Sequence, residues 1–360
     1  MEEQVYQELC QKLAEQGGRP AAMDIPEFYN LIKELFSPEE ATVFNAIPKD
    51  YHTTSTIAAN LEGSEQEISL ILEGMADKGL LLAGEFDGTS FYGITPLETI
   101  IDFQFMRGTN MERDKKLAKL YHVYKEAFYE AKGPPIVNFP TTRVIPIDRR
   151  IKAGNTVHTY QQVASYIEKY DPLAVSTCYC RQEAKLIDEN DICDKPFEAC
   201  MTFGMAAQFV IDRGIGRKIS KGEAAGILKQ SEEAGLVHCS LNRQEIDFLC
   251  NCCRCHCVIL DTAISQPKPG LSLNSGFYPT WNPELCEACE TCIENCPTSA
   301  LVMGNENIPI VNLDLCIGCG VCATGCPEEA IYLVEREGIP IPPVDQKALS
   351  EAVREADQAG

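Results

Sequence analysis

The sequence predicts an α+β protein of three unlike regions, and three observations support this prediction. Helical patterns and short strand patterns alternate over the first two thirds of the chain. The 19 cysteines are spread unevenly, since none lies between Cys10 and Cys178. Near the C-terminus, an arrangement of four cysteines and a proline occurs twice. We therefore expect an N-terminal helical domain, a Cys-rich α+β domain and a C-terminal domain formed by the duplicated motif.

Changes in composition predict five segments. Residues 1–107 form a helical docking domain, 108–150 a helix and an extended linker, 151–270 the Cys-rich domain, 271–340 the domain with the duplicated motif, and 341–360 a C-terminal tail. The linker carries the only clear basic cluster in the middle of the sequence, which suits an internal salt bridge or an acidic partner: Arg143, Arg149 and Arg150.

The overall composition limits location and partners. A chain of 360 residues buries a core without disulfide support, and its N-terminus has no basic stretch followed by an apolar one. We therefore expect a cytoplasmic protein whose thiols serve metal or redox chemistry. No apolar run approaches 18 residues, so no membrane span is predicted. The net charge of −22 disfavours nucleic acid and favours a partner with a basic docking patch; the sequence predicts no oligomeric state.

The N-terminal region shows helices followed by a hairpin. Residues 37–40 start a helix, a second helix covers 68–78, and Gly79 ends it. Residues 80–83 and 91–94 indicate two strands around a turn. This order resembles the winged-helix domain of bacterial repressors. The stretch from Pro38 to Arg107 contains twelve acidic residues and three basic ones. This excess of negative charge excludes docking on DNA phosphates and predicts a protein-docking module. The alternative is a small helical domain that only packs on the rest, and residues 96–132 are expected to form one or two further helices.

The duplicated motif is the strongest signal in the sequence. Cys286-x2-Cys289-x2-Cys292-x3-Cys296-Pro297 recurs 30 residues later as Cys316-x2-Cys319-x2-Cys322-x3-Cys326-Pro327. This pattern resembles the bacterial two-cluster ferredoxin domain over about residues 278–336. Structural zinc is the alternative, but zinc ribbons do not show this spacing.

The resemblance implies a ligand set for two 4Fe-4S clusters. The fourth cysteine of each motif is expected to cross over, so that Cys286, Cys289, Cys292 and Cys326 hold one cluster, and Cys316, Cys319, Cys322 and Cys296 the other. Gly318 and Gly320 flank Cys319, whereas Ala288 and Glu290 flank Cys289. The two clusters should consequently differ in hydrogen bonding, local charge and reduction potential.

Ten further thiols lie in the middle region, with five of them among residues 250–257. Cys178 and Cys180 are expected on a strand, facing the same side, and Cys200 near a helix N-terminus that stabilises its thiolate. Ser220 and Glu223 predict a capping box at the start of a helix. A short strand that carries His238 is expected after this helix. We expect a metal site there, with one cubane or two, and iron-sulfur is favoured over the alternative, zinc. The candidate ligands are Cys178, Cys180, Cys193, Cys200, Cys250, Cys252, Cys253, Cys255 and Cys257.

Two histidines beside these thiols, His238 and His256, are expected to be structural residues. The combination of motifs over about residues 175–335 resembles an unnamed group of iron-sulfur oxidoreductase proteins of anaerobes. The pair Cys252-Cys253 also resembles heterodisulfide reductase catalytic subunits, but a downstream CxxC of that family is replaced here by Cys255 and Cys257. Disulfide reduction is therefore the minority interpretation.

These observations predict an iron-sulfur electron-transfer protein, or an oxidoreductase subunit, of an anaerobic redox pathway. It would pass single electrons between the middle-domain site and a redox partner protein through the two ferredoxin clusters. One alternative is a reductase whose catalytic middle cluster acts on a disulfide or another small substrate. The other is a redox-sensing regulator. No catalytic residue is predicted, and the sequence does not decide whether the chain itself is an enzyme.

Overall fold

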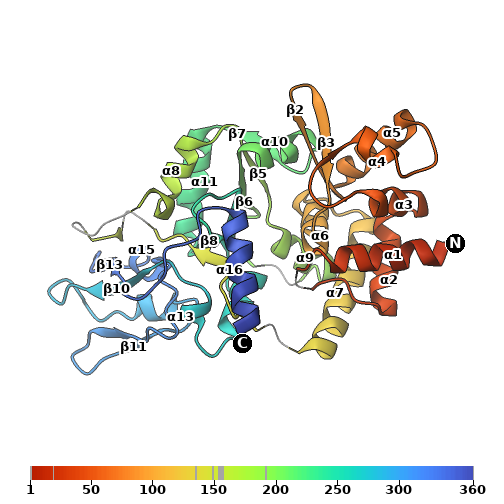
Figure 1. Ribbon diagram of the computed structural model, residues 1–360. Helices are drawn as coiled ribbons and strands as arrows, with labels where there is room; N and C mark the ends of the chain where they lie inside the picture. Colours follow the sequence, from red (N-terminus) through yellow and green to blue (C-terminus); the bar gives the residue numbers. More distant parts are fainter. Residues whose placement is uncertain are drawn as a thin grey trace. The chain divides into compact units, whose positions relative to one another are not determined.

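The computed structural model describes residues 2–18, 20–133, 136–147, 150–152, 158–190 and 193–359 (Figure 1). It combines helices and sheets, as predicted, and divides into two compact units. Unit 1 comprises Met1–Pro135, Tyr179–Ile192 and Gln208–Arg217, and unit 2 comprises Ile136–Cys178, Cys193–Ala207 and Lys218–Gly360. No helix in the described ranges is long and apolar enough to cross a membrane. The five-segment division stays a prediction.

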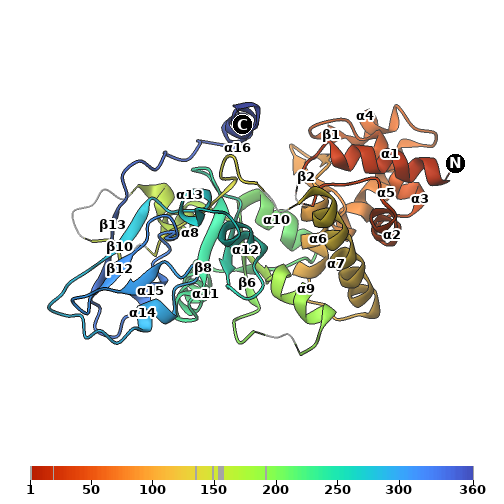
Figure 2. The ribbon, with the colours of Figure 1, turned by 90° about the horizontal axis from the view of Figure 1, so that it is seen from below.

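Unit 1 is mainly helical, with one small sheet of order β1-β3-β2. Its helix α9 packs against α6 and α7 (Figure 2). In chain order its elements are α1 (Glu2–Ala14), α2 (Pro26–Leu35), α3 (Pro38–Ala46), β1 (His52–Thr53), α4 (Thr54–Ala58), α5 (Glu65–Lys78), β2 (Leu82–Phe86), β3 (Thr89–Gly93), α6 (Leu97–Met106), α7 (Glu112–Lys132) and α9 (Tyr179–Ile187).

Local sequence signals account for the boundaries in unit 1. Ser37 and Ser64 form capping boxes at the starts of α3 and α5. Gly79 ends α5 with φ +72°, and a Cβ there would lie 2.8 Å from the Cβ of Phe103. The predicted helices over 96–132 are confirmed as two. The predicted hairpin is confirmed, but its strands extend closer together, because Asp87 and Gly88 close it as a two-residue turn with positive φ at both positions.

Unit 2 is built around a six-stranded sheet of order β4-β8-β9-β6-β5-β7. Helices α8 and α11 pack on one face, over a core that includes Leu173, Met201 and Leu249. The strands are β4 (Thr142–Val144), β5 (Leu173–Thr177), β6 (Glu198–Phe203), β7 (Arg217–Ile219), β8 (Val237–Leu241) and β9 (Phe248–Cys252). The other helices of unit 2 are η2 (Thr159–Gln161), α8 (Val163–Lys169), α11 (Lys221–Glu233), α12 (Val258–Ile264) and α13 (Pro269–Ser272). Helix α10 (Gly204–Asp212) begins in unit 2, and its residues from Gln208 onward belong to unit 1.

The predicted extended linker contains a strand, β4, which pairs with β8 in the sheet of unit 2. Arg143, on β4, is buried and donates from Nη2 to the carbonyl oxygen of Tyr160 at 2.6 Å. Arg150 pairs with Glu329 at 3.0 Å. These two arginines therefore serve internal contacts, while Arg149 lies outside the described residues.

The duplicated motif lies between two antiparallel pairs of strands. The first strand, β10 (Phe277–Trp281), pairs with the last, β13 (Ile331–Glu335), and β11 (Leu301–Met303) pairs with β12 (Pro309–Val311). One short helix carries the third cysteine of each motif: α14 (Thr291–Glu294) and α15 (Val321–Thr324). The predicted C-terminal tail contains a helix, α16 (Gln346–Ala359), whose Leu349 is buried.

Candidate metal centres

Two hollows lie beside the repeated cysteine loops. The first hollow, of about 330 Å³ and open to solvent, is lined by Cys286, Cys289 and Cys292 of the first motif together with Cys326 of the second. The second hollow, of about 310 Å³ and likewise open to solvent, is lined by Cys316, Cys319 and Cys322 together with Cys296. Each hollow thus gathers three thiols of one motif and the fourth thiol of the other.

The backbone repeats with the cysteines. Ala288 and Gly318, which occupy equivalent positions in the two motifs, have φ values of 54° and 70°. Glu290 and Gly320 likewise have φ values of 62° and 86°. The second motif needs glycine for a further reason: a Cβ on Gly318 would lie 2.2 Å from the carbonyl oxygen of Phe277.

Backbone amides approach the sulfur atoms that cross over. The amide of Ala300 donates to Cys296 Sγ at 3.3 Å, and that of Ala330 donates to Cys326 Sγ at 3.4 Å. Amides directed at sulfur suit an iron-sulfur site, where hydrogen bonds to the sulfurs help to set the reduction potential. The donors are equivalent residues, 30 positions apart, so both hollows have this feature.

The electrostatic surroundings of the two hollows differ. Burial raises the pKa of Cys316 to about 11 and that of Cys319 to about 12. In the first hollow, hydrogen bonds from the side chain and backbone of Thr291 lower the pKa of the exposed Cys289. Burial raises the pKa of Cys292, and the neighbouring Trp281 indole acts in the opposite direction.

Two expectations for the middle region are wrong in local structure. β5 ends at Thr177 and α9 starts at Tyr179, so Cys178 lies between a strand and a helix, and Cys180 is helical. The run from Arg181 to Leu186 consists of strong helix formers, which overrides the alternating Cys-x-Cys pattern. Cys200 lies on β6 rather than at a helix N-terminus, since α10 starts only at Gly204. By contrast, the Ser220 cap and the strand carrying His238 are confirmed.

A set of five thiols lies on the face of the sheet opposite α8 and α11. Cys200, Cys250 and Cys239 are direct cross-strand neighbours on β6, β9 and β8. Cys252 lies two residues further along β9, and Cys257 caps α12. Four of them are buried and Cys250 is partly exposed. We call these five residues the buried thiol group: Cys200, Cys239, Cys250, Cys252 and Cys257.

The buried thiol group is tightly connected. Hydrogen bonding with Cys239, together with burial, raises the pKa of Cys252 to about 12. For Cys250, a hydrogen bond with Cys200 lowers the pKa, but contact with Cys252 and burial raise it well above the ordinary value. Cys239, Cys252 and Cys257 share a core cluster with Cys319 of the second hollow. The buried thiol group therefore adjoins the second hollow.

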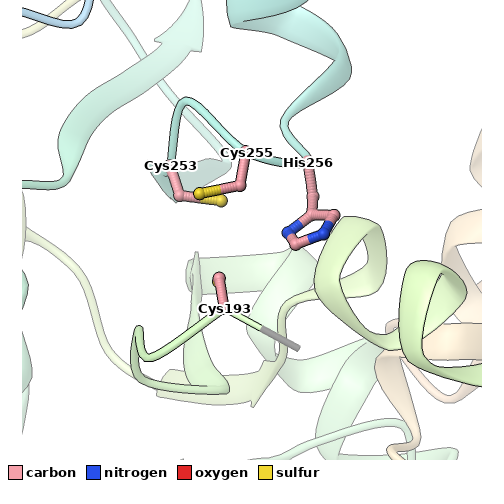
Figure 3. A group of neighbouring side chains, drawn as sticks. All are labelled: Cys193, Cys253, Cys255 and His256. Atoms are coloured by element: carbon pink, nitrogen blue, oxygen red, sulfur yellow. The ribbon is translucent and has the colours of Figure 1, made fainter. Parts of the chain in front are cut away.

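A different set of ligands gathers at the rim of the sheet. Cys193 precedes β6, while Cys253, Cys255 and His256 lie in the turn between β9 and α12 (Figure 3). The three sulfur atoms and one imidazole nitrogen all lie within 4.8 Å of one another. We call these four residues the loop group: Cys193, Cys253, Cys255 and His256.

The structure thus sorts the candidate ligands. Two predicted ligands, Cys178 and Cys180, belong to neither the buried thiol group nor the loop group. Two residues outside the predicted ligands belong to them: Cys239, which the strand pairing places beside Cys250, and His256, expected to be structural. The sequence signal for His256 was its place within the dense run of residues 250–257.

Comparison with known proteins agrees with the C-terminal geometry. Residues 285–331 match the family described as 4Fe-4S dicluster domain. No curated protein and no solved structure is significantly similar to the chain. The match and the clustered cysteines support a ferredoxin-like iron-sulfur domain that binds 4Fe-4S and suggest a role in electron transfer.

Proposed function

We propose that the protein relays single electrons through two 4Fe-4S clusters, each held by three cysteines of one motif and the fourth of the other. The observation that carries this proposal is the composition of the two hollows, which bring Cys326 to the first motif and Cys296 to the second. Each bound cluster supplies a one-electron redox couple. The chain supplies the thiolates, amides directed at sulfur and different degrees of burial, which set the two potentials apart.

The order of the clusters along the relay follows from the exposure of their ligands. Cys289 in the first hollow is exposed, whereas Cys316, Cys319 and Cys322 are buried. The first cluster would exchange electrons with the partner, and the second would pass them to the buried thiol group, with which Cys319 shares a core. An all-thiol donor set suits iron-sulfur chemistry or zinc, and the adjoining cluster favours iron-sulfur there. Since these sulfurs are in hydrogen-bond contact, a cubane would require them to move apart.

The partner would be a redox protein with a basic docking patch in an anaerobic, cytoplasmic pathway. Three glutamates line the first hollow and would attract such a patch: Glu287, Glu290 and Glu328. In unit 1, the order of helices and strands from α3 to β3 supports the winged-helix resemblance, and its acidic surface suits docking on a protein rather than on DNA.

The geometry favours electron transfer over catalysis in the middle domain. Cys239, Cys252 and Cys257 are at most 4% exposed, so a substrate would not reach them without rearrangement. A reductase with a catalytic middle cluster therefore stays the second candidate, and a DNA-binding redox sensor the third. The absence of DNA binding by the full chain at physiological salt would separate the third from the first.

The proposal is tested by preparing the full chain without oxygen and measuring iron, sulfide and zinc per chain, with EPR spectra of the reduced protein. We expect about eight iron atoms from the two clusters and further iron from the buried thiol group. Paired spectra of two interacting clusters would support the relay. Fewer than about five iron atoms after reconstitution would contradict it.

A further inference from the structure

Within the part of the chain that the structure describes, the loop group differs from the other sets of thiols by its donor atoms. Three of its four residues are cysteines and the fourth is a histidine. Three soft sulfurs and an imidazole form one of the common ligand sets of structural zinc, and they select against calcium and magnesium, which prefer oxygen. The chemistry of the donors therefore points to a soft, tetrahedral ion.

The spacing of the donors separates a single ion from a cluster. A tetrahedral zinc with Zn–S bonds of about 2.3 Å holds its ligand atoms roughly 3.8 Å apart. The four donors of the loop group lie within 4.8 Å of one another, close to that arrangement. A cubane binds its four thiolates on four different iron atoms and so keeps them farther apart.

The positions of the donors in the fold suit a structural role. Cys253, Cys255 and His256 lie in one tight turn, and Cys193 comes from a separate loop (Figure 3). An ion bound by all four would join the loop before β6 to the turn after β9. The ends of this turn are Cys252 and Cys257 of the buried thiol group. The ion would therefore stabilise the junction between β9 and α12.

We propose that Cys193, Cys253, Cys255 and His256 bind one zinc ion in a closed tetrahedral site that is separate from the iron-sulfur centres. Binding releases the protons of the three thiols to solvent and leaves the neutral imidazole as the fourth ligand. The ion is a cross-link that carries no electron, since zinc has no accessible redox change. This proposal goes beyond the electron relay and does not depend on it.

The test counts metals in full-length protein that has been reconstituted anaerobically with iron, sulfide and zinc. Wild-type protein should retain about one zinc per chain after gel filtration. Cys255→Ser and His256→Ala should each lose most of it, with unchanged iron and sulfide. Arg254→Ala is the matched control, because Arg254 lies in the same turn, contacts Ser299 and is not one of the four proposed zinc ligands. Its zinc content should equal that of the wild type.

A measurement on the wild type protects the test against variants that fail to fold. Zinc-edge X-ray absorption should give three sulfurs at about 2.3 Å and one nitrogen at about 2.0 Å. Zinc absent from the wild type, zinc retained by both ligand variants, or loss of about four iron atoms in Cys255→Ser would each overturn the proposal. Because zinc and iron are counted separately, a protein with zinc but without the two clusters would contradict the electron relay alone.

Discussion

The first and second hollows are built by the same motif, yet they lie in different surroundings. Cys289 in the first hollow is exposed, and glutamates line that hollow. In the second hollow Cys316, Cys319 and Cys322 are buried, and none of the described residues that line it carries a charge. The comparison teaches that the repeated residues fix how a cluster is held, while the residues between and around them fix what it is exposed to.

The glycines of the second motif are required by the residues packed around them. Gly318 approaches Phe277 and Ser275, so that no side chain fits there. Ala288 and Glu290 adopt the same left-handed backbone but are half-buried and exposed, so their side chains have room. Tight packing around the second motif, rather than cluster binding as such, requires the two glycines.

The largest expected effect comes from replacing the fourth cysteine of either motif by serine. Cys296→Ser should remove the cluster of the second hollow, and Cys326→Ser that of the first, each with a loss of about four iron atoms per chain. Iron analysis and EPR of the reduced variants measure this, with Cys289→Ser as the reference for loss of the first cluster. If Cys296→Ser and Cys289→Ser affect the same cluster, the crossing of ligands is wrong.

Gly318→Ala should be far more harmful than a change at the equivalent position. The new Cβ would lie 2.2 Å from the Phe277 carbonyl oxygen, at a φ of +70°. We expect a loss of about 3 kcal/mol in the free energy of unfolding from overpacking and backbone strain. Ala288→Gly should change it by about 1 kcal/mol or less. Denaturant unfolding of the anaerobic protein gives both values, and equal effects would refute the packing argument.

In the metal-free protein, the thiols of the two hollows should change the stability in opposite directions as the pH rises. Because burial raises the pKa of Cys316 and Cys319 above the ordinary value of 9.0, the folded state holds their protons more tightly than the unfolded state. Their stabilising contribution is full below pH 9 and is lost as the pH rises toward their folded pKa values. Cys289, with a lowered pKa, acts in the opposite direction. Melting temperatures on a pH series should fall above pH 9 and fall less in Cys319→Ala; an unaltered slope would contradict this assignment.

The smallest effect concerns the charge beside the first hollow. Glu290→Gln removes a negative charge from its lining, which should raise the potential of the first cluster. For an exposed charge the shift is about 1 kcal/mol or less, on the order of tens of millivolts for one electron. The control is Glu306→Gln, at an exposed position that lines neither hollow. Potentiometric titration followed by EPR measures both, and equal shifts would show that only net charge matters.

The sequence predicted the ferredoxin-like region well because its determinants are local. Four cysteines at short spacing and a following proline define each loop, and the offset of 30 residues places equivalent residues in equivalent positions. The helix starts at Ser37, Ser64 and Ser220 are likewise set by side chains within one turn. Such features need no knowledge of the rest of the fold.

The middle region was harder because its thiols are brought together by strand register. Cys200 lies 39 residues before Cys239 and 50 before Cys250, and it joins them only when β6 pairs with β9 and β9 with β8. A shift of one residue would have turned Cys250 to the other face. The same holds for the loop group, in which Cys193 meets a turn about sixty residues away. Sequence spacing alone does not predict such partners.

The pairing of β10 with β13 has one more consequence. Phe277 lies opposite Glu335, so the chain enters and leaves the duplicated segment at the same place. A segment whose two ends meet can be inserted into another protein, or removed from one, without forcing the flanking chain apart. We therefore expect the segment, joined by short spacers to an unrelated scaffold, to keep both halves of each cysteine set together.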